Sequence, residues 1–103
     1  MKTFNEKMVS KKISDQDIPS SMKLRIRHDN DNVCIITSLL TGMTMFMNGT
    51  AGRILELSNG ENTILKISEI IASEYQDVTV AMIIEDVKLT LLKCQSIGFV
   101  KVT

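Results

Sequence analysis

The chain of 103 residues carries 12 basic and 12 acidic side chains, and 44% of its residues are hydrophobic. This length fits one domain, and the composition is typical of globular proteins rather than of disordered or membrane-spanning ones. A net charge of zero removes the usual electrostatic argument for binding nucleic acid or an anionic membrane. The polar start lacks a signal-peptide pattern, and no run approaches the roughly 18 apolar residues of a membrane helix, so we expect a cytoplasmic protein.

Basic side chains are concentrated near the N-terminus. Residues 1–27 contain seven Lys and Arg against three Asp and Glu. Residues 1–21 show neither helical nor strand periodicity and end at the only proline, Pro19, which two serines follow. We therefore expect a flexible N-terminal tail over residues 1–21 and one folded domain over residues 22–103. The basic end is either a solvated tail or a contact for an acidic partner.

Three short segments with the pattern of β-strands follow. In residues 22–27, apolar and basic side chains alternate, as in a half-buried strand. Residues 33–40 are rich in β-branched side chains, and residues 43–47 alternate methionine with other residues. Polar turns at residues 28–32 and 41–42 connect these segments, which predicts an antiparallel three-stranded meander.

Helical spacing of apolar residues replaces the strand pattern after the third strand. Each expected helix follows an Asn, Asp or Thr that can cap its first turn, and glycines end the first and the third. The expected helices cover residues 50–58, residues 64–75 and residues up to about 97, with caps at Asn48, at Thr63, and at Asp77 or Thr79. The sequence therefore predicts an α+β domain in which a three-stranded meander precedes three helices.

The third helix has more apolar surface than one core contact needs. An apolar arc runs from Val80 to Cys94, whereas Met82 and Leu89 lie roughly opposite that arc. On a small domain, surplus apolar surface often indicates a partner.

The third strand places Met43, Met45 and Met47 on one face, because side chains alternate along a strand. These methionines are either core residues that pack on the helices or an adaptable apolar wall for an extended peptide. Phe46 lies on the opposite face, either in a small apolar cluster or as a contact for a partner.

Catalytic and metal-binding patterns are missing from the sequence. It has no glycine-rich phosphate loop and no nucleophile elbow. Cys34 and Cys94 are far apart, with only His28 as a companion, so we expect buried, reduced thiols rather than metal ligands or nucleophiles. Glu85 and Asp86 point about 100° apart on a helix, which favours a solvated face over an acid/base pair. We expect no catalytic residue, no metal and no cofactor.

Two stretches carry a resemblance to a known family. One runs from the third strand through the first two helices, and the other covers the third helix and the residues after it. They are Thr41-Gly42-x5-Asn48-x-Thr50 with Ile54-Leu55-x-Leu57-x2-Gly60-x2-Thr63-x3-Ile67, and Ile83-x2-Asp86-Val87-x3-Leu91-x2-Cys94-x3-Gly98-Phe99-Val100. In spacing and in order of elements, the chain resembles the PqqD-like family over about residues 22–102. These small proteins bind the leaders of ribosomally made, post-translationally modified peptides.

The resemblance implies a winged-helix-like domain that has no catalysis of its own. Such a domain holds the leader of a precursor peptide as an added strand beside the third strand and against the third helix. It then presents the peptide to a radical-SAM maturase or to a leader peptidase. An exposed strand edge suits this mode of binding. The peptide-binding residues implied are Thr44, Met45, Phe46, Met47, Ile83, Asp86, Val87 and Thr90, with Asp86 at the rim facing a basic leader residue.

The alternative interpretation is a winged-helix DNA-binding transcription regulator. However, the third helix has only Lys88 and Lys93 against Glu85 and Asp86, and it lacks the Arg, Asn and Gln cluster used to recognise bases. We therefore favour peptide recognition and expect neither a nucleic-acid nor a membrane partner. A third interpretation is an accessory or dimerisation module, so the association of two copies into a homodimer stays open.

Overall fold

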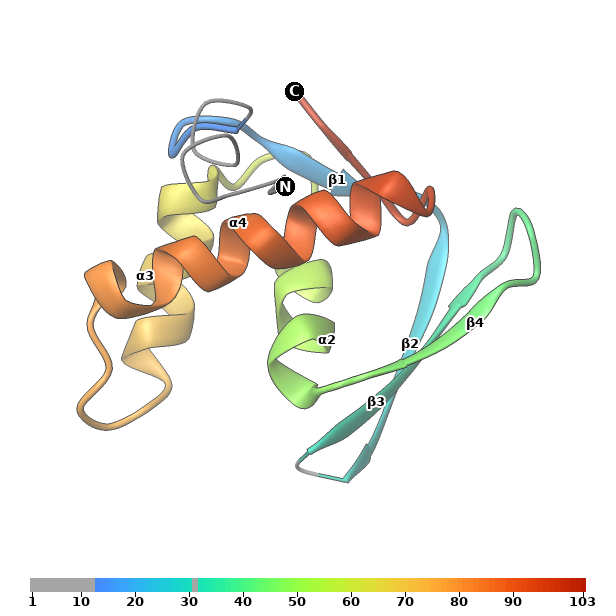
Figure 1. Cartoon of the computed structure of the whole chain (residues 1–103), viewed down its shortest axis with the longest axis horizontal. Coiled ribbons are helices and arrows are strands. Elements are labelled where there is room, and N and C mark those ends of the chain that lie inside the picture. Colours follow the sequence, from blue (N-terminus) through green and yellow to red (C-terminus); the bar gives the residue numbers. More distant parts are fainter. Residues whose placement is uncertain (1–12, 31) are drawn as a thin grey trace, which may run out of the picture.

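The computed structural model describes residues 13–30 and 32–103, which form two antiparallel sheets and three helices (Figure 1). The larger sheet consists of β2 (Leu24–Asn30), β3 (Val33–Ser38) and β4 (Thr44–Met47), and the smaller sheet pairs β1 (Pro19–Ser21) with β5 (Val100–Val102). The α+β class is confirmed. The smaller sheet corrects the expectation of a simple N-terminal meander, and the winged-helix likeness stays a prediction.

The larger sheet has its strands in chain order, and its register places Ile36 opposite both Ile26 and Met45. These three side chains point toward the helices, whereas Arg25 and Arg27 are exposed on the other face of β2. The alternation predicted for this strand is therefore confirmed.

β2 begins two residues later than expected because the chain bends before it. The N–H of Met22 donates to the carbonyl of Phe99 at 2.9 Å, so Met22 belongs with the smaller sheet. Lys23 follows with a φ of 52°, in the left-handed region, and turns the chain from β1 into β2.

The helices α2 (Gly49–Leu57), α3 (Ile64–Ser73) and α4 (Val80–Ser96) lie on one side of the larger sheet (Figure 1). All three were predicted from the apolar spacing, and their bounds differ from the expected ones by at most two residues. Within the described ranges, none of them combines the length and the apolarity needed to cross a bilayer.

The helix N-termini are capped by side chains, as the sequence predicted. Asn48 accepts a hydrogen bond from the N–H of Ala51 at 2.8 Å, and Thr63 and Thr79 cap α3 and α4 in the same way. The cap of α4 is thus Thr79, because Asp77 lies in the preceding turn with a φ of 61°.

Residues 13–21 differ from the expected tail because they pack on the rest of the fold. The side chain of Ile13 is only 2% exposed, and β1 pairs with β5 over all three of its residues. The carbonyl of Asp15 accepts the N–H of Leu65 at 2.9 Å, near the start of α3. The rest of the expected tail, residues 1–12, lies outside the described residues.

A buried lysine holds the same segment to α4. The ammonium group of Lys88 lies 2.7 Å from a carboxylate oxygen of Asp15, and the Lys88 side chain is only 8% exposed. A second carboxylate, that of Glu85, lies 3.7 Å from the same nitrogen. This pairing compensates the charge that burial would otherwise leave without solvation.

The core lies between the larger sheet and the helices and extends to β5. Phe99 is the largest fully buried side chain. It belongs to one buried cluster with isoleucines from β3, α2, α3 and α4. Cys34 and Cys94 are buried and free, as predicted.

Candidate functional site

β4 is an edge strand, and its outer side has no partner strand in the part of the chain that the structure describes. The carbonyl of Met43 accepts the N–H of Ser38 at 2.9 Å. Backbone groups alternate in direction along an antiparallel strand, so the backbone groups of Met45 and Met47 also bond toward β3. Thr44 and Phe46 therefore direct their N–H and C=O groups outward, as an added strand requires.

One hollow adjoins this edge and a second lies beyond the end of β4; because they share lining residues, we treat them as one groove between β4, the start of α2 and α4. Their volumes are about 440 Å³ and about 420 Å³, and they share Asn48, Thr90 and Lys93. The first, the β4 hollow, is also lined by Met45, Phe46, Met47, Ala51, Ser96 and Ile97. The second, the α2 hollow, is also lined by Thr50, Ile54, Ile83, Asp86 and Leu89.

The structure brings together six of the eight residues that the sequence placed in a peptide site. They line the groove from both sides, and their role in binding stays a prediction. The six residues are Met45, Phe46, Met47, Ile83, Asp86 and Thr90.

Two predicted site residues do not line the groove. Val87 is fully buried in the core, because its face of α4 packs against the other elements rather than toward the opening. Thr44 is exposed and its hydroxyl lies 3.1 Å from that of Thr37 on β3. Thr44 therefore faces the groove edge only with its backbone.

Several lining residues were not among the predicted site residues. Lys93 and Leu89 lie on the same stripe of α4 as Asp86, at the spacing of three and four residues that brings side chains together on a helix. That spacing was sufficient to predict that Lys93 and Leu89 lie beside Asp86. Asn48 and Thr50 line the groove because α2 starts directly after β4, and no periodicity indicates such a corner.

The methionines of β4 pack against the core and also border the groove. Met45 and Met47 are partly buried against the core and also line the β4 hollow. Met43 is 43% exposed and lies before the strand. Phe46 is 71% exposed, which favours its interpretation as a contact over a buried cluster.

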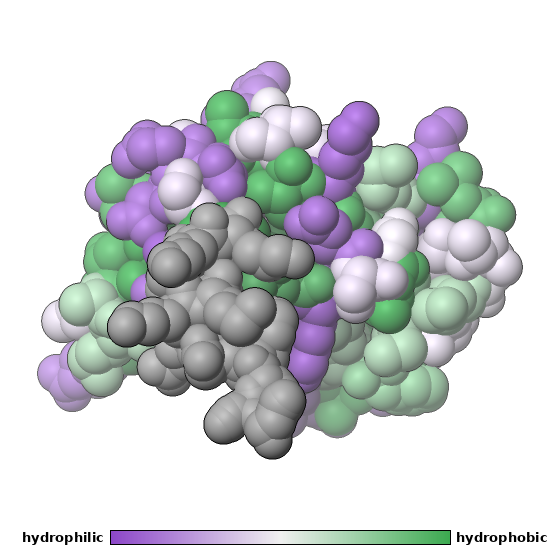
Figure 2. All heavy atoms as spheres, turned by 45° about the horizontal axis from the view of Figure 1, so that its top comes forward, coloured by the Kyte–Doolittle hydropathy of each residue, from purple (hydrophilic) through white to green (hydrophobic). Residues whose placement is uncertain are grey.

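Further apolar side chains are exposed at the tip of the β3–β4 hairpin. Leu39 and Leu40 are each 57% exposed. Hydrophobic residues are visible at the right-hand end of Figure 2, where Figure 1 places this hairpin. The exposed apolar surface of the larger sheet thus extends beyond the groove.

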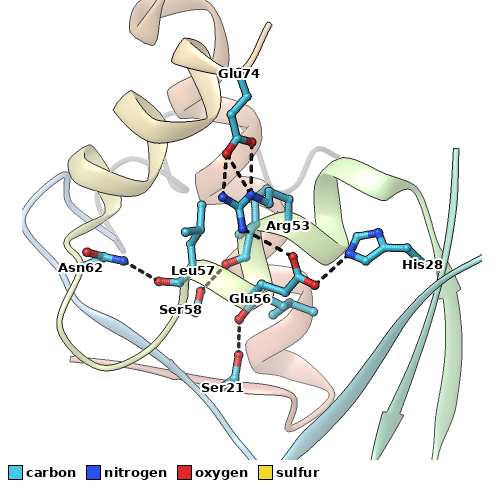
Figure 3. Close-up of polar contacts among 10 residues, drawn as sticks. Ser21, His28, Arg53, Glu56, Leu57, Ser58, Asn62 and Glu74 are labelled. Atoms are coloured by element: carbon cyan, nitrogen blue, oxygen red, sulfur yellow. Dashed lines mark hydrogen bonds and ion pairs between the residues drawn. The ribbon is translucent and has the colours of Figure 1, made fainter. Parts of the chain in front are cut away.

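A polar cluster joins β2, α2 and the end of α3 (Figure 3). A ring nitrogen of His28 lies 2.9 Å from Glu56, and the guanidinium of Arg53 donates to Glu74 with a shortest distance of 2.6 Å. The hydrogen bonds from Arg53 to Glu74 raise the pKa of that guanidinium, although partial burial opposes the change. None of these four residues lines the groove, and their contacts join α2 to β2 and to the end of α3.

The two thiols are not poised for chemistry. Burial raises the pKa of Cys94 to about 11, although Lys93 nearby acts in the opposite direction, and burial also raises the pKa of Cys34. Both groups are therefore protonated near neutral pH, and a thiol is a poor nucleophile. Residues 13–30 and 32–103 contain no group of three His, Cys, Asp or Glu side chains arranged to hold a metal ion.

Comparison with known families identifies the chain. The sequence model of PqqD, described as coenzyme PQQ synthesis protein D, matches residues 34–100. This match covers more than half of the chain, from β3 to the first residue of β5. The chain belongs to the PqqD family. The resemblance found in the sequence is thus confirmed, and membership in the PqqD family fits a non-catalytic protein that binds a precursor peptide in a biosynthetic pathway. Comparison with curated proteins and with solved structures gave no match.

Proposed function

We propose that this PqqD-family protein binds the leader region of a ribosomally made precursor peptide as an additional strand on β4. The observation that carries the proposal is the unpartnered edge of β4, in the described part of the chain, beside a groove that α4 closes on its other side. Main-chain hydrogen bonds to the edge provide affinity, and side-chain contacts in the groove provide selectivity.

The dimensions of the site suit a short extended segment. β4 has four residues, which at about 3.4 Å per residue give an edge of roughly 14 Å. An added strand of four or so residues would receive hydrogen bonds from Thr44 and Phe46. Its alternate side chains would enter the groove against Met45, Met47 and Ile83.

The role of the bound complex is presentation. The protein holds the leader while a modifying enzyme, a radical-SAM maturase or a leader peptidase, acts on the peptide. Two features support this division of labour: the buried, protonated thiols, and the engagement of His28 and Arg53 in a cluster outside the groove.

Replacing Phe46 tests the strand-addition mode. Phe46→Pro removes an outward N–H without removing a hydrogen bond to β3, and an edge strand tolerates proline. We expect this variant to bind the leader peptide about three- to tenfold more weakly, which corresponds to one lost backbone hydrogen bond. Phe46→Ala keeps the N–H and is the matched control, which we expect to bind more tightly than the proline variant. Isothermal titration gives the affinities, and melting temperatures check the fold.

Chemical-shift mapping with the same leader peptide locates the contact. We expect shifts in β4 and α4. Shifts confined to α2 and α3, with β4 and α4 unchanged, would overturn the proposed mode even if the peptide bound tightly.

The DNA-binding alternative gains no support from α4. Of its two lysines, Lys88 is buried against Asp15, which leaves Lys93 as the exposed base on this helix. Asp86 shares its face, so the helix lacks the excess of positive charge that contacts with several phosphates need.

A further inference from the structure

The groove contains one acidic and one basic residue. Asp86 and Lys93 are the only charged side chains that line it in the described part of the chain. Both are exposed, and neither takes part in an ion pair with another described residue. They lie seven residues apart on one face of α4, which is about 10.5 Å along the helix axis. The helix therefore holds two opposite charges at fixed, separate positions.

The two hollows show the direction of α4 relative to β4. In the β4 hollow, Met45 lies with Ser96 and Ile97, at the end of α4. In the α2 hollow, beyond the end of β4, the α4 residues are Ile83 and Asp86. α4 therefore runs opposite to β4 along the groove, as Figure 1 also shows.

The direction of an added strand follows from the sheet. All strand pairs of the larger sheet are antiparallel, and antiparallel pairing is the slightly more stable arrangement. A peptide that pairs with β4 in this way runs in the same direction as α4. Its earlier residues then lie near Asp86 and its later residues near Lys93.

We propose that Asp86 and Lys93 select a peptide in which a basic residue precedes an acidic residue. This inference rests on the proposed function and adds to it the charge order of the occupant and its direction in the groove. Side chains that face α4 from a strand are separated by an even number of positions. With about 3.4 Å per residue, the two charged peptide residues have one or three residues between them.

Selection from a displayed library of random dodecapeptides tests the charge order, and it does not require the natural peptide. With the unmodified protein, we expect enrichment of Lys or Arg followed two or four positions later by Asp or Glu. With the double variant Asp86→Lys and Lys93→Asp, we expect the reverse order. A double exchange on α3, Lys66→Glu and Glu69→Lys, keeps the net charge and is the control for changes outside the groove.

Affinities of one enriched peptide and its charge-reversed form provide the quantitative test. We expect the unmodified protein to prefer the enriched peptide about three- to tenfold, since each exposed ion pair contributes modestly. The preference should invert in the groove double variant and persist in the α3 control. It should also decrease in about 0.5 M salt, because salt screens the attraction between exposed charges. Melting temperatures verify that each variant is folded.

The outcomes separate this inference from the proposed function. In one outcome, the enriched peptides bind less tightly to Phe46→Pro, but they show no charge order, or the same order with the unmodified protein and the groove double variant. This outcome would overturn the inference and leave strand addition intact. If no enriched peptide depends on β4, strand addition itself is wrong.

Discussion

At Gly52, the interior of the protein leaves no room for a side chain. A Cβ atom at this position would overlap the sulfur of Cys34 and lie 3.3 Å from a ring carbon of His28. Cys34 is fully buried, so its side chain would have to shift within the core to accommodate the added atom. Glycine at this place lets α2 approach β3 closely.

We expect Gly52→Ala to lower the free energy of unfolding by about 1–3 kcal/mol, as overpacking in a core does. Alanine's better helix propensity offsets only part of this cost. Chemical denaturation measures the change. A double variant that adds Cys34→Ala removes the obstructing sulfur and should be more stable than Gly52→Ala alone. Equal stability of the two would show that the contact is unimportant.

Cys94 makes the free energy of unfolding depend on pH in the alkaline range. Burial raises its pKa from 9.0 to about 11 in the folded protein, so the unfolded chain ionises first as the pH rises. The contribution of this thiol is fully present below pH 9.0 and is lost between pH 9.0 and about 11. We expect the free energy of unfolding to fall less steeply over this interval in Cys94→Ala than in the unmodified protein. Parallel slopes in the two proteins would contradict the prediction.

At the scale of single elements, the sequence predicted those features that depend on interactions between neighbouring residues. The caps at Asn48, Thr63 and Thr79 and the alternation in β2 are visible within a few residues of sequence. Val87, which the sequence placed in the site, does not line the groove for a different reason. Asp86 and Val87 are neighbours on α4, and which of them faces the groove depends on how the helix crosses the sheet.

The segment before β1 is the element whose contribution differs most from expectation. We expect Ile13→Ala to lower the free energy of unfolding by about 2–4 kcal/mol, because it removes a buried side chain from the core. Gln16→Ala, at an exposed position of the same segment, is the control and should change stability by less than about 0.5 kcal/mol. Similar values for both variants, measured by denaturant titration, would place Ile13 outside the cooperative unit.

At the scale of the whole molecule, the sequence predicted the larger sheet and the helices but not the contacts between distant segments. β1 and β5 have three residues each, too few for a strand period to be recognisable. Their pairing, and that of Asp15 with Lys88, joins positions more than 70 residues apart. The groove has the same origin: its residues come from β4, α2 and α4, and only their packing brings them together.

The pairing of β1 with β5 also determines how the molecule responds to mechanical force. Pro19 pairs with Val102 and Ser21 with Val100, so the outward ends of the two strands lie at the same end of the small sheet. Tension that pulls the chain termini apart therefore loads one residue pair at a time, as in unzipping, instead of shearing all pairs together. An unfoldase that pulls on the C-terminal side of β5 meets this weak direction first, and the buried residues it then exposes are Val100 and Phe99.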